Sequence, residues 1–316
     1  MPSIVKHLTA AALAACSVAA AAQAPAFIYS PYKYLAHDFP FIVDGKRTVG
    51  PGALTWAFAT GECGQEKWGK ESAQQVADKH VAAFDQAGLS YLVSTGGQGG
   101  VFTCATDEGM ERFISRYESK HLIGLDFDIE AGQSAAQVES LVQRIKAAQV
   151  KRPHLRFSFT VATHAATDGS RKSLNLEGEA ILAALKRNGV REFTFNLMVM
   201  NYGPGKPANC VVNPNGVCDM GRSAIQAARN VHEKYQLPYR QLELTAMIGV
   251  NDVVSNVFTL DDARMVNAAA RQMKLAGLHY WSLERDQPCK APVKRASPVC
   301  SGLPVKALAY HRILSR

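Results

Sequence analysis

The stretch Leu122-Ile123-Gly124-Leu125-Asp126-Phe127-Asp128-Ile129-Glu130 carries a carboxylate at every second position of an otherwise apolar run. Successive side chains of a β-strand point to opposite faces, so Asp126, Asp128 and Glu130 share one face and the apolar residues share the other. This pattern suits a strand that has helices packed on one side and polar chemistry on the other.

The alternative interpretation is a sheet face that is simply solvated. If the face is buried, three like charges persist there only when protons are shared and the pKa values are pushed apart. One carboxyl then stays protonated near neutral pH while its neighbour is ionised. That is the condition for general acid catalysis.

The whole chain predicts eight strands that alternate with helices. Strands are expected at 27–29, 54–59, 91–93, 122–130, 155–161, 193–202, 242–248 and 279–283. Helices are expected at about 72–87, 107–117, 135–148, 176–188, a segment ending near 235, 260–275 and 305–314. This order predicts an α/β fold, an eight-stranded parallel β/α (TIM) barrel in a single domain, with its chemistry at the carboxyl ends of the strands.

The composition indicates a globular chain that does not bind nucleic acid. Of the 316 residues, 47% are hydrophobic and 20% are charged, which is enough apolar material for a large core. The net charge of +8 comes from lysines and arginines that are scattered along the chain. We interpret them as solvated surface.

The N-terminus has the pattern of an export signal. Lys6 precedes a stretch of small apolar residues, 8–22, that is too short to remain in a bilayer. We predict a signal peptide at 1–22, a catalytic domain at 23–316, and a secreted or periplasmic protein. The alternative is a lipoprotein signal at 1–15, because Leu13-Ala14-Ala15-Cys16 resembles a lipoprotein box and would anchor the protein to a membrane through Cys16.

The remaining cysteines form an even set of six, which agrees with export. Their spacing favours two short loops, closed by Cys210 with Cys218 and by Cys289 with Cys300. Cys63 and Cys104 are then left to pair with each other. No C-x-x-C spacing occurs, which argues against a metal site.

The carboxylate strand resembles the D-x-x-D-x-D-x-E signature of family 18 glycoside hydrolases, the chitinases and their relatives. Asp126, Asp128 and Glu130 match its last three acidic positions, whereas Ile123 occupies the first. One strand earlier, Ser94-Thr95-Gly96-Gly97 resembles the S-x-G-G motif of the same family. From this resemblance Ser94, Gly96 and Gly97 are substrate-site candidates, although a serine and two glycines also make an ordinary turn.

Two later segments are similar to this family as well. Met198-Val199-Met200-Asn201-Tyr202 resembles its methionine-and-tyrosine segment, which implies that Tyr202 contacts the acetamido group of the sugar. Met198, Met200 and Asn201 are substrate-binding candidates, and core packing is the alternative for the two methionines. Many relatives have Asp where this chain has Asn201.

Trp281 stands in the place of the tryptophan that forms the floor of the sugar site in this family. Flat aromatic faces suit the apolar faces of pyranose rings. The segment 247–252 looks family-like too, and Glu284-Arg285-Asp286 is expected near the barrel mouth.

The resemblance implies a retaining chitinase that cleaves β-1,4-linked N-acetylglucosamine polymers through the substrate's own acetamido group. Glu130 is then the general acid and base, Asp128 orients the acetamido group, and Asp126 tunes Asp128. The resemblance implies chitin or its oligosaccharides as the partner, no metal or organic cofactor, and a monomer. The alternatives are an endo-β-N-acetylglucosaminidase that acts on glycoproteins and a non-catalytic chitin- or carbohydrate-binding barrel.

The length of one connection bears on the mode of attack. Only 29 residues separate Gly249 from His279, and we expect a helix to take most of them. Processive relatives commonly carry an α+β insertion there that walls a deep cleft. The short connection therefore predicts an open groove and an endo-acting enzyme.

Overall fold

The computed structural model describes residues 26–37, 42–43, 46–47, 50 and 52–316. The expected signal peptide and Cys16 lie outside the described residues. In the described part of the chain, no helix has the length and apolar character needed to cross a bilayer.

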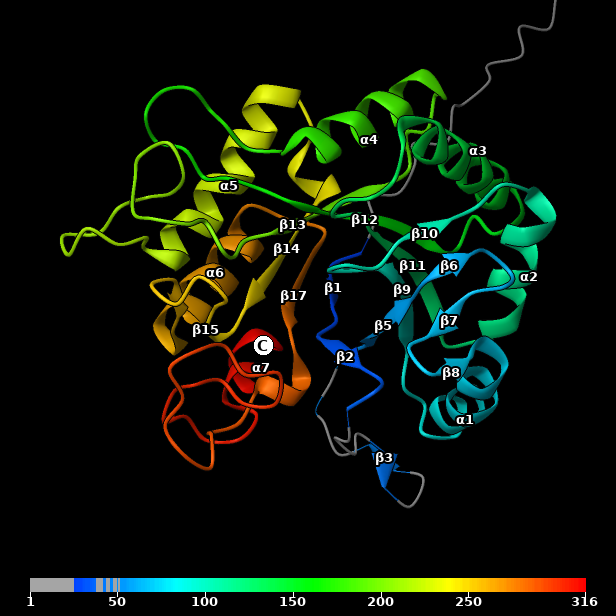
Figure 1. The fold of residues 1–316 in the computed structure, drawn as a ribbon, viewed down its shortest axis with the longest axis horizontal. Helices are drawn as coiled ribbons and strands as arrows, with labels where there is room; N and C mark the ends of the chain where they lie inside the picture. The colour runs from blue at the N-terminus through cyan, green and yellow to red at the C-terminus, as the bar shows by residue number, and fades with distance from the viewer. Residues whose placement is uncertain (1–25, 38–41, 44–45, 48–49, 51) are drawn as a thin grey trace, which may run out of the picture.

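A parallel sheet of nine strand segments forms the centre of the molecule, and the helices surround it (Figure 1). Each strand segment is hydrogen-bonded in parallel to the next in the order β1-β17-β14-β13-β12-β11-β9-β5-β2. The segments are β1 (Ile28–Tyr29), β2 (Tyr32–Tyr34), β5 (Leu54–Ala59), β9 (Tyr91–Gly96), β11 (Leu122–Asp128), β12 (Arg156–Ala162), β13 (Thr194–Met198), β14 (Leu242–Met247) and β17 (Gly277–Trp281).

The two ends of this sheet meet in one stretch of chain, which closes it into a barrel of eight strand positions. β1 pairs with β17, and β2, which follows after Ser30 and Pro31, pairs with β5. The expected α/β barrel is confirmed. The first strand is longer than the expected 27–29, because the chain continues along the barrel wall after Pro31.

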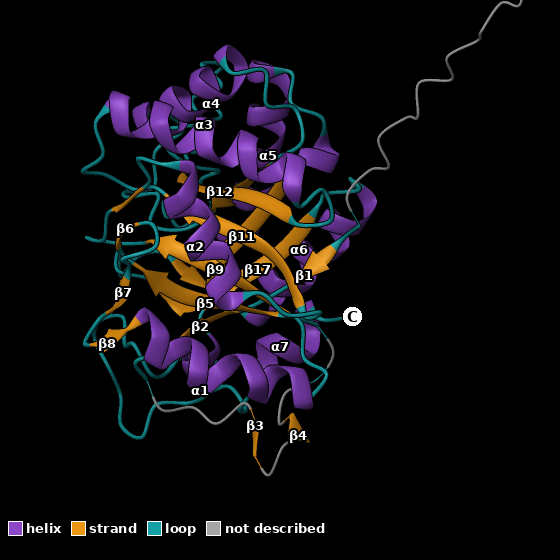
Figure 2. Ribbon diagram, turned by 90° about the vertical axis from the view of Figure 1, so that its right-hand side faces the viewer, coloured by secondary structure: helices purple, strands orange, loops and turns teal. Residues whose placement is uncertain are grey.

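Seven α-helices in the described chain pack around the strands, as Figure 2 shows from the side. They are α1 (Ala73–Gln86), α2 (Asp107–Tyr117), α3 (Ala135–Lys151), α4 (Leu176–Arg187), α5 (Met220–Tyr235), α6 (Leu260–Gln272) and α7 (Ala309–Leu314). Helices α1 to α6 each begin after a Ser, Thr, Asn or Asp whose side chain accepts a backbone N–H of the first turn. Such caps satisfy donors that would otherwise lack partners, so the sequence itself sets where these helices start.

Short elements decorate the connections between strands and helices. They are β3 (Ile42–Val43) with β4 (Lys46–Arg47), β6 (Gly61–Glu62) with β10 (Phe102–Thr103), β7 (Lys67–Trp68) with β8 (Glu71–Ser72), β15 (Gly249–Val250) with β16 (Val257–Phe258), and the 3₁₀ turns η1 (Tyr239–Gln241) and η2 (Leu283–Arg285). The expectation that a helix takes most of the connection after Gly249 is wrong. Helix α6 has 13 residues, and the β15–β16 hairpin precedes it.

The core lies between the outer face of the barrel and the helices. Leu125 and Phe127 of β11 point into it and are fully buried, as are Leu141 and Ile145 of α3. An apolar face of α3 therefore packs on the strands, and the apolar residues of the alternating pattern in β11 face the helices.

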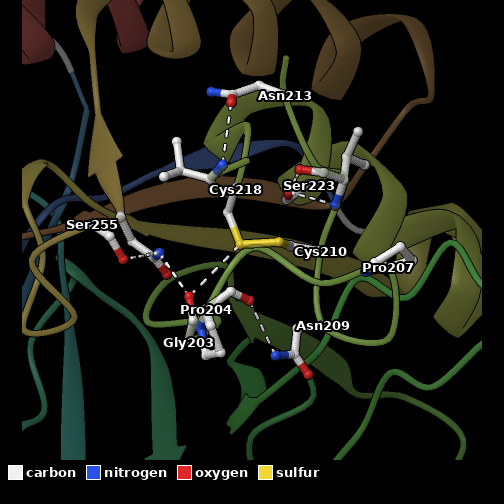
Figure 3. Close-up of a disulfide and its surroundings, with 12 residues drawn as sticks. Gly203, Pro204, Pro207, Asn209, Cys210, Asn213, Cys218, Ser223 and Ser255 are labelled. Carbon is white, nitrogen blue, oxygen red and sulfur yellow. Dashed lines mark hydrogen bonds between the residues drawn. A yellow bond between two sulfur atoms is a disulfide. The ribbon is translucent and has the colours of Figure 1, made fainter. Parts of the chain in front are cut away.

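All three expected disulfides are present, joining Cys63 to Cys104, Cys210 to Cys218, and Cys289 to Cys300. Figure 3 shows the bond between Cys210 and Cys218, which fastens the loop that follows β13. In the same loop the Asn209 side chain donates to the Pro204 carbonyl at 3.3 Å. The pairing inferred from spacing is therefore confirmed.

Candidate active site

Strand β11 points its acidic side chains into the barrel. Asp126 is 2% exposed and Asp128 is 5% exposed, while Phe127 between them faces the helices. The strand ends at Asp128, so Glu130 lies two residues beyond it, at the carboxyl end of the barrel, and is half-buried. The predicted alternation is confirmed, with the solvated-face alternative excluded by the burial of both aspartates.

Four hydroxyl groups surround the Asp126 carboxylate. Ser94 (2.6 Å) and Tyr32 (2.8 Å) donate to Oδ2, while Thr160 (2.7 Å) and Ser158 (2.8 Å) donate to Oδ1. Burial raises the pKa of Asp126, and the hydroxyl donors act in the opposite direction. The four donors offset part of this rise, because hydrogen bonds to the charged form favour that form, but the pKa of Asp126 remains above its usual value.

Asp128 has the contrasting environment. Its Oδ1 is buried and accepts no hydrogen bond from the described residues. Burial, followed by the negative charges of Glu130 and Asp126, raises the pKa of Asp128 well above its usual range. Because the pKa is raised further at Asp128 than at Asp126, a proton shared by the two aspartates belongs on Asp128.

Glu130 faces a second acidic residue, which the sequence did not reveal as part of the site. Burial raises the pKa of Glu130, and the charge of Asp252 raises it further. Asp252 follows β15, and its Oδ2 accepts a hydrogen bond from Asn201 Nδ2 at 3.0 Å. A carboxyl with a raised pKa at the rim of a cavity is suited to general acid catalysis.

A cavity of about 250 Å³ opens above these carboxyl groups. Its floor is aromatic, because Trp281 and Phe58 stack with ring centroids 5.4 Å apart and an interplanar angle of 17°. The lining residues are Tyr32, Phe58, Gln98, Asp128, Glu130, Thr160, Ala162, Thr163, His164, Met198, Met200, Asn201, Thr245, Met247, Asp252 and Trp281. Acidic groups beside a flat apolar floor match the mixed polar and apolar surface of a sugar ring.

Six of the eleven residues predicted for the site line the cavity, namely Asp128, Glu130, Met198, Met200, Asn201 and Trp281. Asp126 accepts a hydrogen bond from Ser94, and Gly96 and Gly97 lie at the end of β9, but none of these four lines the cavity. Tyr202 is 3% exposed, does not line the cavity, and has a hydroxyl without a partner among the described residues.

The physical reason for the position of Tyr202 is the backbone just before it. The expected strand 193–202 ends at Met198, and Asn201 has φ = 51°, in the left-handed region. This conformation interrupts the strand alternation that would have put Met198, Met200 and Tyr202 on one face. Met200 therefore lines the cavity wall, whereas the contact expected between Tyr202 and the acetamido group of a sugar stays a prediction.

The two glycines after Ser94 have a geometric role. Gly96 and Gly97 have φ values of 81° and 78°, which favour glycine. A Cβ on Gly96 would come within 2.1 Å of the Asp128 carbonyl oxygen, and one on Gly97 within 2.7 Å of the Phe58 ring. The glycines thus let the turn after β9 pass directly against the carboxylate strand.

Several site residues were missed, and some of them carried a signal. Ser158 and Thr160 alternate with apolar residues in β12 as the acids do in β11, and both prove to be partners of Asp126. Asn196 of β13 donates to Tyr32 Oη (3.0 Å) and to Thr160 Oγ1 (2.9 Å). Tyr32 gave no comparable signal, since it lies in a segment too short to show a period.

The described residues contain one cluster with metal-ligand geometry, and it lies outside the cavity. Glu62, Cys63 and Cys104 place their ligand atoms within 4.8 Å of one another. Because the two sulfurs are joined in a disulfide, neither is a thiolate. The chemistry of this donor set therefore does not fit a metal.

Comparison with known proteins adds independent findings. No protein-family model matches the chain. It is 26% identical over 284 residues to a probable bifunctional chitinase/lysozyme of Escherichia coli (strain K12), covering 84% of this chain and 31% of that protein. It is also 26% identical over 293 residues to endochitinase 11 of Metarhizium anisopliae, covering 86% of this chain and 55% of that one. The chain thus spans about a third and about half of the length of these two relatives.

A solved structure covers nearly the whole fold. The catalytic domain of a hyperthermophilic chitinase from Pyrococcus furiosus matches with a TM-score of 0.69 and 25% sequence identity. The match covers 93% of this chain and 95% of that one. The similarity therefore extends over the barrel and its connections, well beyond the carboxylate strand.

Proposed function

We propose that this chain, which belongs to the family 18 glycoside hydrolases, hydrolyses β-1,4-linked N-acetylglucosamine polymers, with Glu130 as general acid and base. One observation carries the proposal. Asp126 accepts hydrogen bonds from four hydroxyl groups, whereas Asp128 Oδ1 accepts none from the described residues. Both aspartates precede Glu130 at alternate positions, and Asp128 and Glu130 line a cavity with an aromatic floor. This arrangement separates the pKa values of the three carboxyl groups, as acid–base catalysis requires.

The first chemical step breaks the glycosidic bond. Glu130 donates its proton to the glycosidic oxygen, and the bond from that oxygen to the anomeric carbon breaks with the electron pair going to oxygen. The carbonyl oxygen of the substrate's own 2-acetamido group bonds to the anomeric carbon from the opposite face. No enzymic nucleophile takes part in this step.

The second step restores the original configuration at the anomeric carbon. The Glu130 carboxylate accepts a proton from water, and the oxygen of that water bonds to the anomeric carbon as the acetamido oxygen leaves. Two inversions give net retention. The step also leaves Glu130 protonated for the next cycle.

Asp128 and Asp126 act on the acetamido group between these steps. Asp128 is close enough to the cavity to orient that group, and the negative charge of Asp126 beneath it supports the positive charge that develops on the ring. Trp281 and Phe58 support the apolar face of the same sugar. We assign no substrate contact to Tyr202.

The test of this function compares two substrates. Colloidal chitin and a high-mannose glycoprotein are incubated separately with the protein, and the products are analysed by mass. Release of N-acetylglucosamine oligosaccharides from chitin supports the proposal, and glycan release from the glycoprotein alone supports an endo-β-N-acetylglucosaminidase. Binding without any product supports a carbohydrate-binding barrel. Proton NMR of the fresh products reports the anomer, and an initial α-anomer would contradict retention.

The proposal includes an endo mode of attack in an open groove. Between β14 and β17 the chain forms only the β15–β16 hairpin and α6, which leaves little material for an additional wall. We expect the viscosity of a soluble, partly acetylated polymer to fall early, with mixed short products. High viscosity with the disaccharide as nearly the sole early product would contradict the open groove.

We further propose that the protein acts as a monomer outside the reducing cytoplasm. Three disulfides link all six cysteines after Cys16, and such bonds persist in oxidising compartments. Peptide mapping without reductant on the exported protein tests this proposal, and free thiols at these positions would contradict it.

A further inference from the structure

Three consecutive charged residues, in and just after the 3₁₀ turn η2 that follows β17, are buried outside the active site. Glu284 and Arg285 are each 1% exposed and Asp286 is 0% exposed, and none of them lines the cavity. They were expected near the barrel mouth, yet they point into the protein. Burying charged groups is costly unless each one is satisfied, so their partners reveal what the segment holds.

Each of the three side chains contacts a different part of the fold. Glu284 Oε1 accepts from Lys33 Nζ on β2 at 2.5 Å. Arg285 donates to the carbonyl oxygens of Ile248 (2.8 Å) and Val250 (2.7 Å), at and just before β15.

Asp286 fixes the C-terminal helix to the same segment. Its oxygens accept the backbone N–H groups of Tyr310 (3.0 Å) and His311 (2.7 Å), at the start of α7. The end of β17 is thus tied to the first barrel strand, to the β15 hairpin and to α7. The link made by Glu284 reaches β2, whose Tyr32 lines the cavity.

The link made by Glu284 lies at a gap in the barrel ladder. β1 is hydrogen-bonded to β17 only as far as Ser30, whose N–H donates to the Leu278 carbonyl at 3.4 Å. Beyond Pro31 the strand turns to β5. Among the described residues, the backbone hydrogen bonds of β17 beyond Leu278 go to β14 and to Ile248, which directly follows β14.

The gap separates two walls of the candidate active site. On one side Tyr32 donates to Asp126, and Lys33 is the next residue. On the other side Trp281 forms the floor, three residues before Glu284. Trp281 meets this strand through aromatic rings, with centroids 6.1 Å from those of both Tyr32 and Tyr34, and such ring contacts are a weak constraint compared with a buried ion pair.

We infer that the Lys33–Glu284 ion pair positions the Trp281 platform against Tyr32 and the carboxylates. Lys33 Nζ also donates to the carbonyl oxygens of Tyr34 (2.8 Å) and His37 (2.6 Å), so its position is fixed from the β2 side. Both residues are positioning residues, because neither lines the cavity. The inference rests on the proposed function only in that Trp281 carries a sugar.

The test replaces the ion pair by an apolar pair. Removing one partner leaves a buried charge, so each single variant is expected to lose stability, whereas Lys33→Met/Glu284→Met is expected to keep a melting temperature near that of the wild type. In the double variant we expect KM for chitotetraose to rise about tenfold with a smaller change in kcat, because the platform is displaced while the acid is not. Wild-type KM in this variant would overturn the inference.

A matched control is a second buried ion pair inside the same barrel. Arg156 of β12 and Glu243 of β14 form a pair far from the cavity lining, with side chains 7% and 2% exposed. Arg156→Met/Glu243→Met is likewise expected to stay folded and to leave KM unaltered. If both double variants raise KM equally, the Lys33–Glu284 pair has no special link to the platform, and the inference is overturned.

Two further measurements keep the inference testable. If the double variant does not fold, Glu284→Asp retains the charge and shortens the side chain by one methylene. We expect a raised KM in Glu284→Asp, and a wild-type KM there overturns the inference. Acrylamide quenching of Trp281 fluorescence should increase in the ligand-free double variant, or in Glu284→Asp where the double variant does not fold. The Trp281→Phe protein serves as the blank that reports the fluorescence of Trp56 and Trp68. Unchanged quenching overturns the inference even if the protein cleaves no chitin, which separates its failure from that of the proposed function.

Discussion

Two buried carboxylates inside the same barrel have opposite electrostatic environments. Near its amino-terminal end, Glu243 of β14 contacts the Arg156 guanidinium and lies 3.3 Å from His279 Nε2. At its carboxyl-terminal end, Asp128 of β11 has neighbouring carboxylates and an Oδ1 without a donor among the described residues. Glu243 is 1% exposed and Asp128 is 5% exposed, so burial does not distinguish them.

The partners determine the direction of each pKa shift. Burial raises the pKa of both groups, but the attraction of Arg156 and the contact with His279 outweigh it for Glu243 and lower its pKa to about 2. At Asp128 the charges of Glu130 and Asp126 add to burial and raise the pKa. One end of the barrel therefore holds a permanent ion pair, and the other holds a proton that can take part in chemistry.

The largest effect is expected from Glu130→Gln, because the amide keeps the shape of the side chain but has no acidic proton. We expect kcat on chitotetraose to fall by about 10²- to 10⁴-fold, with oligosaccharide binding largely retained. Steady-state kinetics and calorimetric binding measure the two quantities. A variant with nearly full activity would remove Glu130 from the mechanism.

Asp128→Asn tests the proton-holding end directly. The amide removes the titrating group while it preserves the volume, and we expect a loss of about 10²-fold in kcat, since the carboxyl that orients the acetamido group is lost. The melting temperature should change little or rise, because a carboxyl without a donor is replaced. An unaffected rate would argue against participation of the acetamido group.

Glu243→Gln tests the ion-paired end, and here stability rather than rate should change. Because the folded-state pKa of about 2 lies below the usual 4.5, this carboxylate stabilises the fold above about pH 4.5, and the contribution is lost as the pH falls toward 2. The shift corresponds to an order of magnitude of ~3 kcal/mol. Denaturant unfolding at pH 7 and pH 3 should show a large difference between wild type and variant at pH 7 and a smaller one at pH 3. Equal differences at both pH values would contradict the assignment.

The smallest effect is expected from Asp252→Asn, which removes a charge that raises the pKa of Glu130. Glu130 must be protonated to act as the acid, so its pKa sets the alkaline limb of the kcat profile against pH. We expect that limb to move to lower pH in Asp252→Asn and to higher pH in Asn201→Asp, which adds a carboxylate beside Asp252. An alkaline limb unmoved in both variants would show that Asp252 does not act on Glu130.

Much of the fold could be predicted because its signals are local. Cap residues such as Ser72 and Thr106 mark helix starts, and α2 has the expected bounds. The prediction failed where the chain departs from a regular period. The first strand continues after Pro31 as a second segment, and the left-handed conformation of Asn201 ends the alternation expected for 193–202.

For the site, the sequence by itself determined which side chains share a face, since alternation at period two is a property of the strand alone. Asp126, Asp128 and Glu130 were placed correctly on that basis. Only the tertiary structure decided which groups meet them. Tyr32 reaches Asp126 across 94 residues, and Asp252 faces Glu130 across more than a hundred. Such contacts depend on how eight strands register and close, which no short stretch encodes, and these contacts set the pKa values on which the chemistry depends.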